Sequence, residues 1–122
     1  MVEELRHSVA PEPVRAWIAR PPGWLEIVKP RGSVTLARLD AGESQAIALA
    51  IETHADLLLL DEQAGRLEAA RQGLKVAGTL AVLDDADQAG IIKFEDAVAR
   101  LRGTSFRIFL AVLAQIREKR IR

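Results

Sequence analysis

The stretch LDAGESQAIALAIETHADLLLLDEQAGR, residues 39–66, decides the fold of this chain. Its first half places four side chains on one helix face, at i, i+3, i+4 and i+7: Ile47, Ala50, Ile51 and His54. That spacing predicts a helix from Glu43 to about His54. Its second half contains the uninterrupted apolar run Leu57–Leu60, which is typical of a strand buried on both faces of a parallel sheet.

The sequence after this stretch continues the alternation of helices and strands. Glycines mark the ends of several helical segments, and Thr79 is a suitable helix cap. The expected elements are a helix over 62–72, a strand over 75–77, and helices over 79–90, 94–103 and 105–119. Strands that alternate with helices of this length indicate right-handed βα units in a parallel sheet.

The sequence before residue 39 predicts two helical segments and one more strand. Pro11 and Pro13 open a helix, because proline is tolerated in a first turn, and Trp24–Val28 reads as a short strand. Three strands are few for a parallel sheet that is covered by helices on both faces. We therefore expect an α/β fold in which helices dominate and the sheet is incomplete.

Length and composition restrict the function classes. The 122 residues suggest a single domain over 1–122, and 17 basic against 17 acidic residues argue against binding nucleic acid by net positive charge. The absence of cysteine excludes disulfides and zinc–cysteine sites. No run approaches the roughly 18 apolar residues of a membrane span, and the acidic N-terminus resembles no signal peptide, so a cytoplasmic location is expected.

The motif in residues 39–66 resembles a known family. The pattern L-D-x-G-E-x-x-A-I-x-L-A, an apolar strand and then D-[DE]-x-x-[AG]-R is similar to predicted nucleic-acid-binding proteins of the PIN-domain group. Members look like the toxins of VapBC-type toxin–antitoxin pairs. The segments VAGTLAVL (76–83) and PEPVRAWIARPPGWLEI (11–27) also resemble the family, so the similarity covers nearly the whole chain.

The resemblance implies a three-layer α/β/α fold and a metal-dependent endoribonuclease. Carboxylates at the carboxyl ends of the strands would hold Mg²⁺ or Mn²⁺, hard ions that take oxygen ligands. Three positions match the family's acidic residues: Glu4, Glu43 and Asp61. An antitoxin partner and an RNA substrate are implied in the same way.

One family feature has no counterpart in the sequence. The first metal ligand is usually an aspartate in an opening V-D-[TS]-[SG] strand, and no such segment is present. The resemblance therefore implies a chain that is N-terminally truncated and lacks the first, central strand and the second strand. Either the start codon was placed too late, or a second copy covers the exposed surface.

Each proposed ligand also has a plainer interpretation. Glu43 and Asp40 have the spacing of a helix capping box, and Asp61 is placed to cap the helix that follows it. Glu4, or its neighbour Glu3, could lie on a solvated face. His54 is expected to be a capping or half-buried side chain.

Two charged clusters could likewise have either a functional or a purely structural role. Adjacent residues do not share a helix face, so Asp84, Asp85 and Asp87 are expected to be a solvated surface. Basic residues near the C-terminus complement a helix end or contact RNA: Arg117, Lys119 and Arg120.

The last predicted helix carries two apolar stripes. One contains Phe106, Phe109, Leu110 and Leu113, and the other contains Ile108, Val112 and Ile116. A surface helix needs one stripe, so we expect a homodimer through Phe106–Ile116. Two functions remain: a metal-dependent, toxin-like ribonuclease, or a non-catalytic dimeric module that binds nucleic acid or protein.

Overall fold

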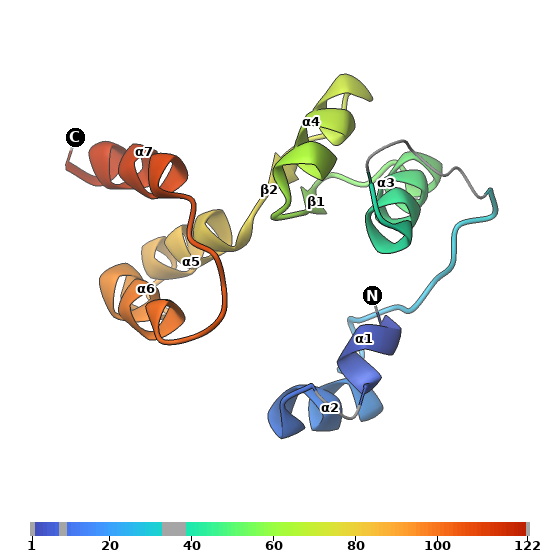
Figure 1. The fold of residues 1–122 in the computed structure, drawn as a ribbon, viewed down its shortest axis with the longest axis horizontal. Helices are drawn as coiled ribbons and strands as arrows, with labels where there is room; N and C mark the ends of the chain where they lie inside the picture. Colours follow the sequence, from blue (N-terminus) through green and yellow to red (C-terminus); the bar gives the residue numbers. More distant parts are fainter. Residues whose placement is uncertain (1, 8–9, 33–38, 122) are drawn as a thin grey trace. The chain divides into compact units, whose positions relative to one another are not determined.

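The computed structural model describes residues 2–7, 10–32 and 39–121, with the side chain of Glu4 outside the description (Figure 1). The chain divides into two compact units, Met1–His54 and Ala55–Arg122.

The first unit begins with two packed helices, α1 (Val2–Arg6) and α2 (Glu12–Ala19). Helix α2 starts where the sequence predicts, because Pro11 is extended and proline occupies the first turn, where no backbone donor is needed. Its Ile18 is buried, and the rings of Trp17 and Trp24 lie 6.2 Å apart between centroids.

Helix α3 (Ala41–Thr53) confirms the helix that the periodicity predicts. Its start is fixed by Asp40, whose Oδ1 accepts a 2.7 Å hydrogen bond from the Glu43 N–H. Its end is unusual because His54 adopts the left-handed conformation, with φ 52° and ψ 48°. The His54 N–H there donates to the carbonyls of Ala50 and Ile51, so His54 closes the helix as a cap.

The prediction of a strand at Trp24–Val28 was wrong. The backbone there forms a turn in which the Leu25 N–H donates to the Pro22 carbonyl, and an irregular segment follows. Trp24 is 75 % exposed. A strand exists only through hydrogen bonds to a neighbouring strand, and the described residues of this unit provide none. Apolar, β-favouring residues alone were therefore insufficient.

The second unit opens with a βαβ motif. Strand β1 (Leu58–Leu59) pairs in parallel with β2 (Val76–Ala77), and α4 (Gln63–Arg71) connects them. The N–H groups of Leu58 and Leu60 donate to the carbonyls of Lys75 and Ala77 at 2.9 and 3.0 Å. The predicted alternation of strand, helix and parallel strand is confirmed here. The prediction that β1 is buried on both faces was wrong, because Leu57 and Leu59 are 50 % and 54 % exposed and the described sheet has two strands.

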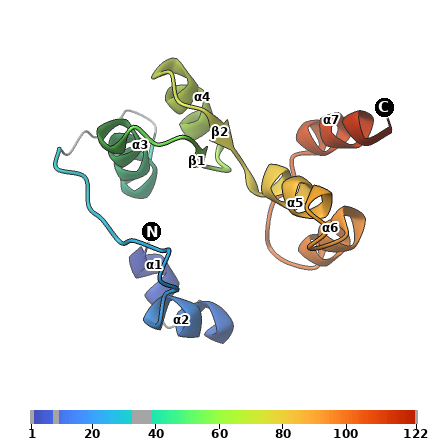
Figure 2. The same cartoon turned by 180° about the vertical axis from the view of Figure 1, so that it is seen from behind.

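Three helices complete the second unit: α5 (Thr79–Gln88), α6 (Phe94–Arg102) and α7 (Leu110–Ile121). The two opposite views in Figures 1 and 2 both show α5 beside α6 and α7. Their common core contains Leu80, Phe94, Val98, Leu113 and Ile116. Helix α7 begins at Leu110 rather than near Ser105, because residues 103–109 form a turn and an irregular segment.

The fold is α/β with helices dominant, as the sequence predicts. Across the described ranges, a parallel pair of very short strands is accompanied by seven helices. No helix in these ranges combines the length and the apolar character that crossing a bilayer requires.

Candidate functional site

Asp61 follows β1 directly and reaches across to the start of α5. Its Oδ1 accepts a 2.8 Å hydrogen bond from the Thr79 N–H, and its Oδ2 accepts a 2.7 Å bond from the Thr79 hydroxyl. The cap residue of α5 is Gly78, which has no side chain to supply this acceptor. Asp61 therefore caps α5 from a position 18 residues earlier in the chain.

Gly78 is required by the same contact. A Cβ atom at this position would lie 2.8 Å from the Asp61 Oδ1 and 3.5 Å from the Leu60 carbonyl oxygen. The first distance is too short for any side chain, so the absence of a Cβ lets the carboxylate approach the N-terminus of α5. The positive end of the helix dipole there offsets the charge of Asp61.

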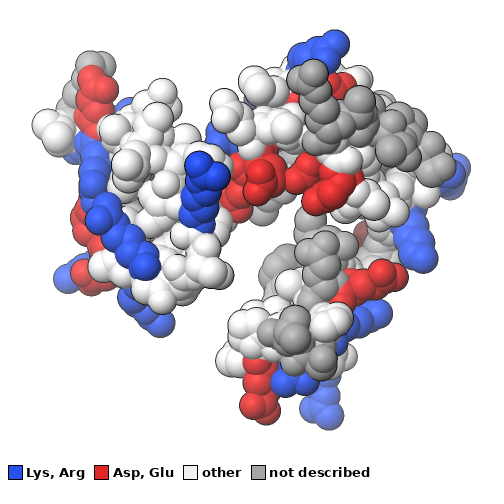
Figure 3. All heavy atoms as spheres, viewed as in Figure 1, with Lys and Arg blue, Asp and Glu red and all other residues white. Residues whose placement is uncertain are grey.

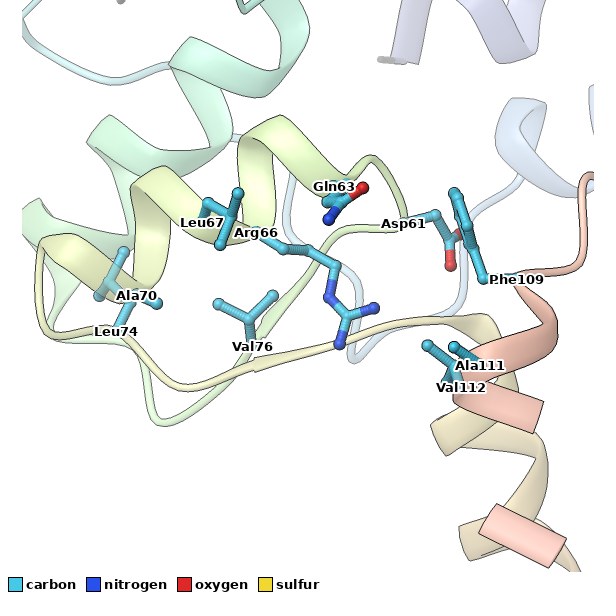
Figure 4. A pocket seen from close by; sticks show the side chains of 10 residues that line it. All are labelled: Asp61, Gln63, Arg66, Leu67, Ala70, Leu74, Val76, Phe109, Ala111 and Val112. Carbon is cyan, nitrogen blue, oxygen red and sulfur yellow. The ribbon is translucent and has the colours of Figure 1, made fainter. Parts of the chain in front are cut away.

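Asp61 also lies at the edge of a pocket of about 480 Å³ between α4, β2 and the beginning of α7 (Figure 4). Most of its lining is apolar, including Leu67, Leu74, Val76 and Val112. A neighbouring hollow of about 250 Å³ shares Asp61 and adds Glu62 and Arg107. Asp61 therefore lies near the end of β1, contacts the start of α5 and lines both hollows.

Arg66 is the main cation of this pocket. It comes from the first turn of α4, and Figure 4 shows its side chain extending into the space between α4 and α7. It is half-buried, yet its guanidinium has no hydrogen bond or ion pair with the residues that the structure describes. A partly buried, unpaired guanidinium is suited to receive an anion from outside the chain.

Phe109 forms the opposite rim, just before α7. Its half-buried ring lines the pocket beside Asp61 (Figure 4). The Arg107 guanidinium lies over this ring, with its central carbon 5.8 Å from the ring centroid. The rim therefore combines an aromatic ring with an arginine.

The other two proposed ligands lie in the first unit. Glu43 is half-buried in the first turn of α3, and its backbone N–H belongs to the Asp40 cap. The backbone of Glu4 lies in α1, while its side chain falls outside the described atoms. Asp61 lies in the second unit, so the three proposed ligands are divided between the two units.

The acidic cluster after Leu83 is structural rather than simply solvated. Arg120 forms ion pairs with Asp84 and Asp87, and its guanidinium lies 4.9 Å from the centroid of the buried Phe94 ring. Asp87 also accepts a 2.6 Å hydrogen bond from the Phe94 N–H. That bond and the Arg120 side chain lower the pKa of Asp87 below its ordinary value.

A second arginine near the end of α7 also forms an ion pair within the unit. Arg117 pairs with Glu95 at 2.6 Å, which lowers the pKa of Glu95 and raises that of Arg117. On the face shown in Figure 3, basic and acidic side chains of α5–α7 interleave rather than forming a patch of one sign. Arg117 and Arg120 are therefore engaged within the unit.

The described donors do not by themselves fit a divalent metal ion. Mg²⁺ and Mn²⁺ prefer several oxygen ligands, whereas both Asp61 oxygens already accept bonds from Thr79. In the main pocket Asp61 is the one carboxylate among the lining residues, and Arg66 beside it repels a cation. Among the residues with a described placement, no three histidine or acidic side chains come together.

The sequence indicated Asp61 but not its surroundings. The prediction that Thr79 caps the helix was wrong, because the cap residue is Gly78 and Thr79, the first residue of α5, donates to Asp61. Nothing in the sequence signalled a role for Arg66. The signal that was available is the G-T pair directly after the second strand of a βαβ unit. Parallel strands bring their carboxyl ends to one edge, which places Gly78 beside Asp61.

Comparison with known proteins identifies the family. A family model described as a PIN domain matches residues 2–120. Searches of curated proteins and of solved structures returned no match. The match spans nearly the whole sequence and confirms the resemblance carried by residues 39–66. The chain therefore belongs to the PIN-domain family.

Proposed function

We propose that this PIN domain is a nuclease-like protein that engages single-stranded RNA, and that the chain on its own binds RNA without cutting it. The family supports the first part, since PIN domains are nuclease-like. The second part rests on Asp61, whose two oxygens serve as the cap of α5 and leave the pocket with an unpaired arginine rather than a carboxylate cluster.

The net charge of zero requires that binding come from a local site. Arg66 in the main pocket and Arg107 in the neighbouring hollow are the cations that an incoming phosphate would meet, and the dipole of α5 partly offsets the charge of Asp61. Binding that depends on few phosphate contacts is weak and decreases with salt.

The test is a binding and cleavage assay on one labelled RNA. We expect the fluorescence anisotropy of a short fluorescein-labelled oligouridine to rise with protein in low salt and EDTA. Added Mn²⁺ should leave the RNA intact on a denaturing gel. No binding at a protein concentration of about 0.1 mM, where even non-specific binding is detectable, would refute the proposal.

A second candidate is a metal-dependent, toxin-like endoribonuclease in which Glu4, Glu43 and Asp61 hold Mg²⁺ or Mn²⁺. The observation in its favour is the position of Asp61, directly after a parallel strand, where α/β proteins place ligands. A cognate antitoxin and a cytoplasmic location belong to this candidate.

Metal binding separates the two candidates without relying on activity. Clustered carboxylates repel one another, so a working site gains stability when a metal binds. Under our first proposal, millimolar Mn²⁺ leaves the melting temperature unchanged. A rise with Mn²⁺ that both Asp61→Asn and Glu43→Gln abolish, together with Mn²⁺-dependent cleavage, would replace it with the second candidate.

A further inference from the structure

We infer that the pocket between α4 and the start of α7 holds one nucleotide of single-stranded RNA, with the base against Phe109 and a phosphate on Arg66. This inference rests on the proposed function and assigns it a binding site. It needs only residues of the second unit, whose placement relative to each other the structure gives.

Phe109 has the position that a base-stacking residue needs. Phe94 is fully buried in the helical core, whereas Phe109 lines the pocket with a half-buried ring. Single-stranded nucleic acid is commonly held by stacking bases on aromatic rings and arginine planes, and Arg107 lies over this ring. An aromatic rim of this kind accepts any base, because every base has a flat face.

Arg66 provides the matching anion site. Its guanidinium reaches into the pocket and has no partner among the described residues. Asp61 lies nearby, but both of its oxygens accept bonds from Thr79 and it forms no ion pair with Arg66, so the guanidinium donors remain available. The forked donors of a guanidinium match two oxygens of one phosphate.

The dimensions and lining favour a nucleotide over an apolar peptide. A volume of about 480 Å³ lies within the range of pockets that enclose small ligands. An apolar side chain docked here would bury the Arg66 guanidinium without a partner, which is costly. In a bound nucleotide, the base and ribose would cover the apolar wall at Leu67 and Val76, and the phosphate would pair with Arg66.

The experiment measures RNA affinity for two pairs of variants of the full chain, without metal. Phe109→Leu retains apolar volume and is paired with Leu110→Ala, which changes an exposed neighbour. Arg66→Met retains length and is paired with Arg71→Met, an exposed arginine on the same helix. Circular dichroism confirms that all four variants fold as the wild type does.

We expect Phe109→Leu to weaken oligouridine binding about tenfold, as loss of a stacking ring does. Arg66→Met should weaken it for every RNA sequence and lower the salt slope by about one phosphate contact. Both control variants should stay within about twofold of the wild type. Saturation-transfer NMR with uridine monophosphate should show base protons close to the protein, and Phe109→Leu should remove that signal.

Two results would overturn the inference and leave the proposed function standing. One is wild-type RNA binding that Phe109→Leu and Arg66→Met change no more than their controls do. The other is a dimer that Phe109→Leu dissociates while RNA affinity is unchanged, since a second copy would then fill the pocket. Conversely, monophosphate binding lost in Phe109→Leu, without any RNA binding, supports the pocket and refutes the proposed function.

Discussion

At the scale of single residues, Asp61 connects the end of a strand to the beginning of a helix. Gly78 cannot cap α5 with a side chain, and Asp61 supplies both the acceptor for the Thr79 N–H and a partner for its hydroxyl. A residue that the family resemblance suggests as a metal ligand therefore caps a helix in this chain. The contact depends on the close approach that Gly78 allows.

Gly78→Ala should break this cap. The new Cβ would lie 2.8 Å from the Asp61 Oδ1, so the carboxylate must move away from Thr79. We expect the free energy of unfolding to fall by about 1–3 kcal/mol, the cost of leaving such donors without their partner. Urea denaturation followed by circular dichroism measures the loss.

Gly103→Ala is the matched control, since its Cβ would meet only the Arg100 carbonyl oxygen, at 3.4 Å. It should change the free energy of unfolding much less. Equal effects of the two substitutions would show that the Asp61–Thr79 contact contributes nothing particular.

A second prediction at this scale concerns acid. The Phe94 N–H, and then Arg120, lower the pKa of Asp87 from its ordinary value of 3.8. A carboxyl group with a lowered pKa stabilises the folded state above its ordinary pKa, and this contribution is lost as pH falls through the folded value. Asp87→Asn should therefore flatten the fall in melting temperature below about pH 4.

Asp85→Asn is the control for Asp87→Asn, because Asp85 is an exposed acid on the same helix. Melting temperatures are compared between about pH 2 and pH 6, the range in which carboxyl groups ordinarily titrate. If Asp85→Asn and Asp87→Asn flatten the curve equally, the effect comes from net charge and not from the Phe94 and Arg120 contacts.

The sequence predicted the contacts of Asp61, Asp84 and Asp87 only in part. Asp61 was singled out because it follows an apolar strand, which is a local property. Its partner Thr79 lies 18 residues away and depends on the parallel pairing of β1 with β2. Likewise, the spacing of Asp84 and Asp87 predicted solvent, because Arg120 enters only through the packing of α7 against α5.

At the scale of elements, α3 has an end that its sequence does not favour. His54 adopts a left-handed conformation that costs a side-chain-bearing residue about 1–2 kcal/mol, and its side chain is exposed. His54→Gly should stabilise the end of α3 by about 0.5–1 kcal/mol, after allowing for the greater freedom of glycine in the unfolded chain. Slower hydrogen exchange of the last α3 amides would demonstrate it.

Gln45→Gly provides the opposite control within the same helix. Gln45 is exposed in the interior of α3, where glycine costs about 0.5–1 kcal/mol relative to alanine. Its α3 amides should exchange faster. Faster exchange in His54→Gly as well would show that the histidine side chain stabilises the cap.

Elements with strong local signals were predicted well. Asp40 at a cap position and a sustained stripe gave α3, and two apolar runs around a helix gave the βαβ motif. Trp24–Val28 failed because a strand needs a partner that local sequence cannot supply. The start of α7 was misplaced because the apolar spacing continues through residues 106–109, which are not helical.

At the scale of the whole molecule, α7 leaves two large apolar side chains exposed away from its core. Leu113 and Ile116 are buried, whereas Leu110 is 72 % and Ile121 87 % exposed, and an interval of 11 residues puts these two on one helix face. The expected homodimer through Phe106–Ile116 remains a prediction, and the exposure of Leu110 within that range supports it.

Leu110→Asp tests that dimer more cleanly than Phe109→Asp, because Phe109 lines the pocket. We expect the wild type to scatter light as a dimer at low micromolar concentration and Leu110→Asp to shift it towards monomer, since the charge resists burial. Gln115→Asp, on an exposed part of the same helix, should not. A folded wild-type monomer would contradict the prediction.

The cap that Asp61 forms also affects how this family should be surveyed. A residue that a fold needs for its own assembly is retained by purifying selection, whether or not the protein still performs chemistry. Counting an aspartate at this position as a mark of enzymatic competence would then classify inactive descendants as enzymes. In this chain Gly78 and Thr79 hold that aspartate as a helix cap, so an aspartate followed by such a pair after the next strand is expected to stabilise the fold whether or not it binds a metal.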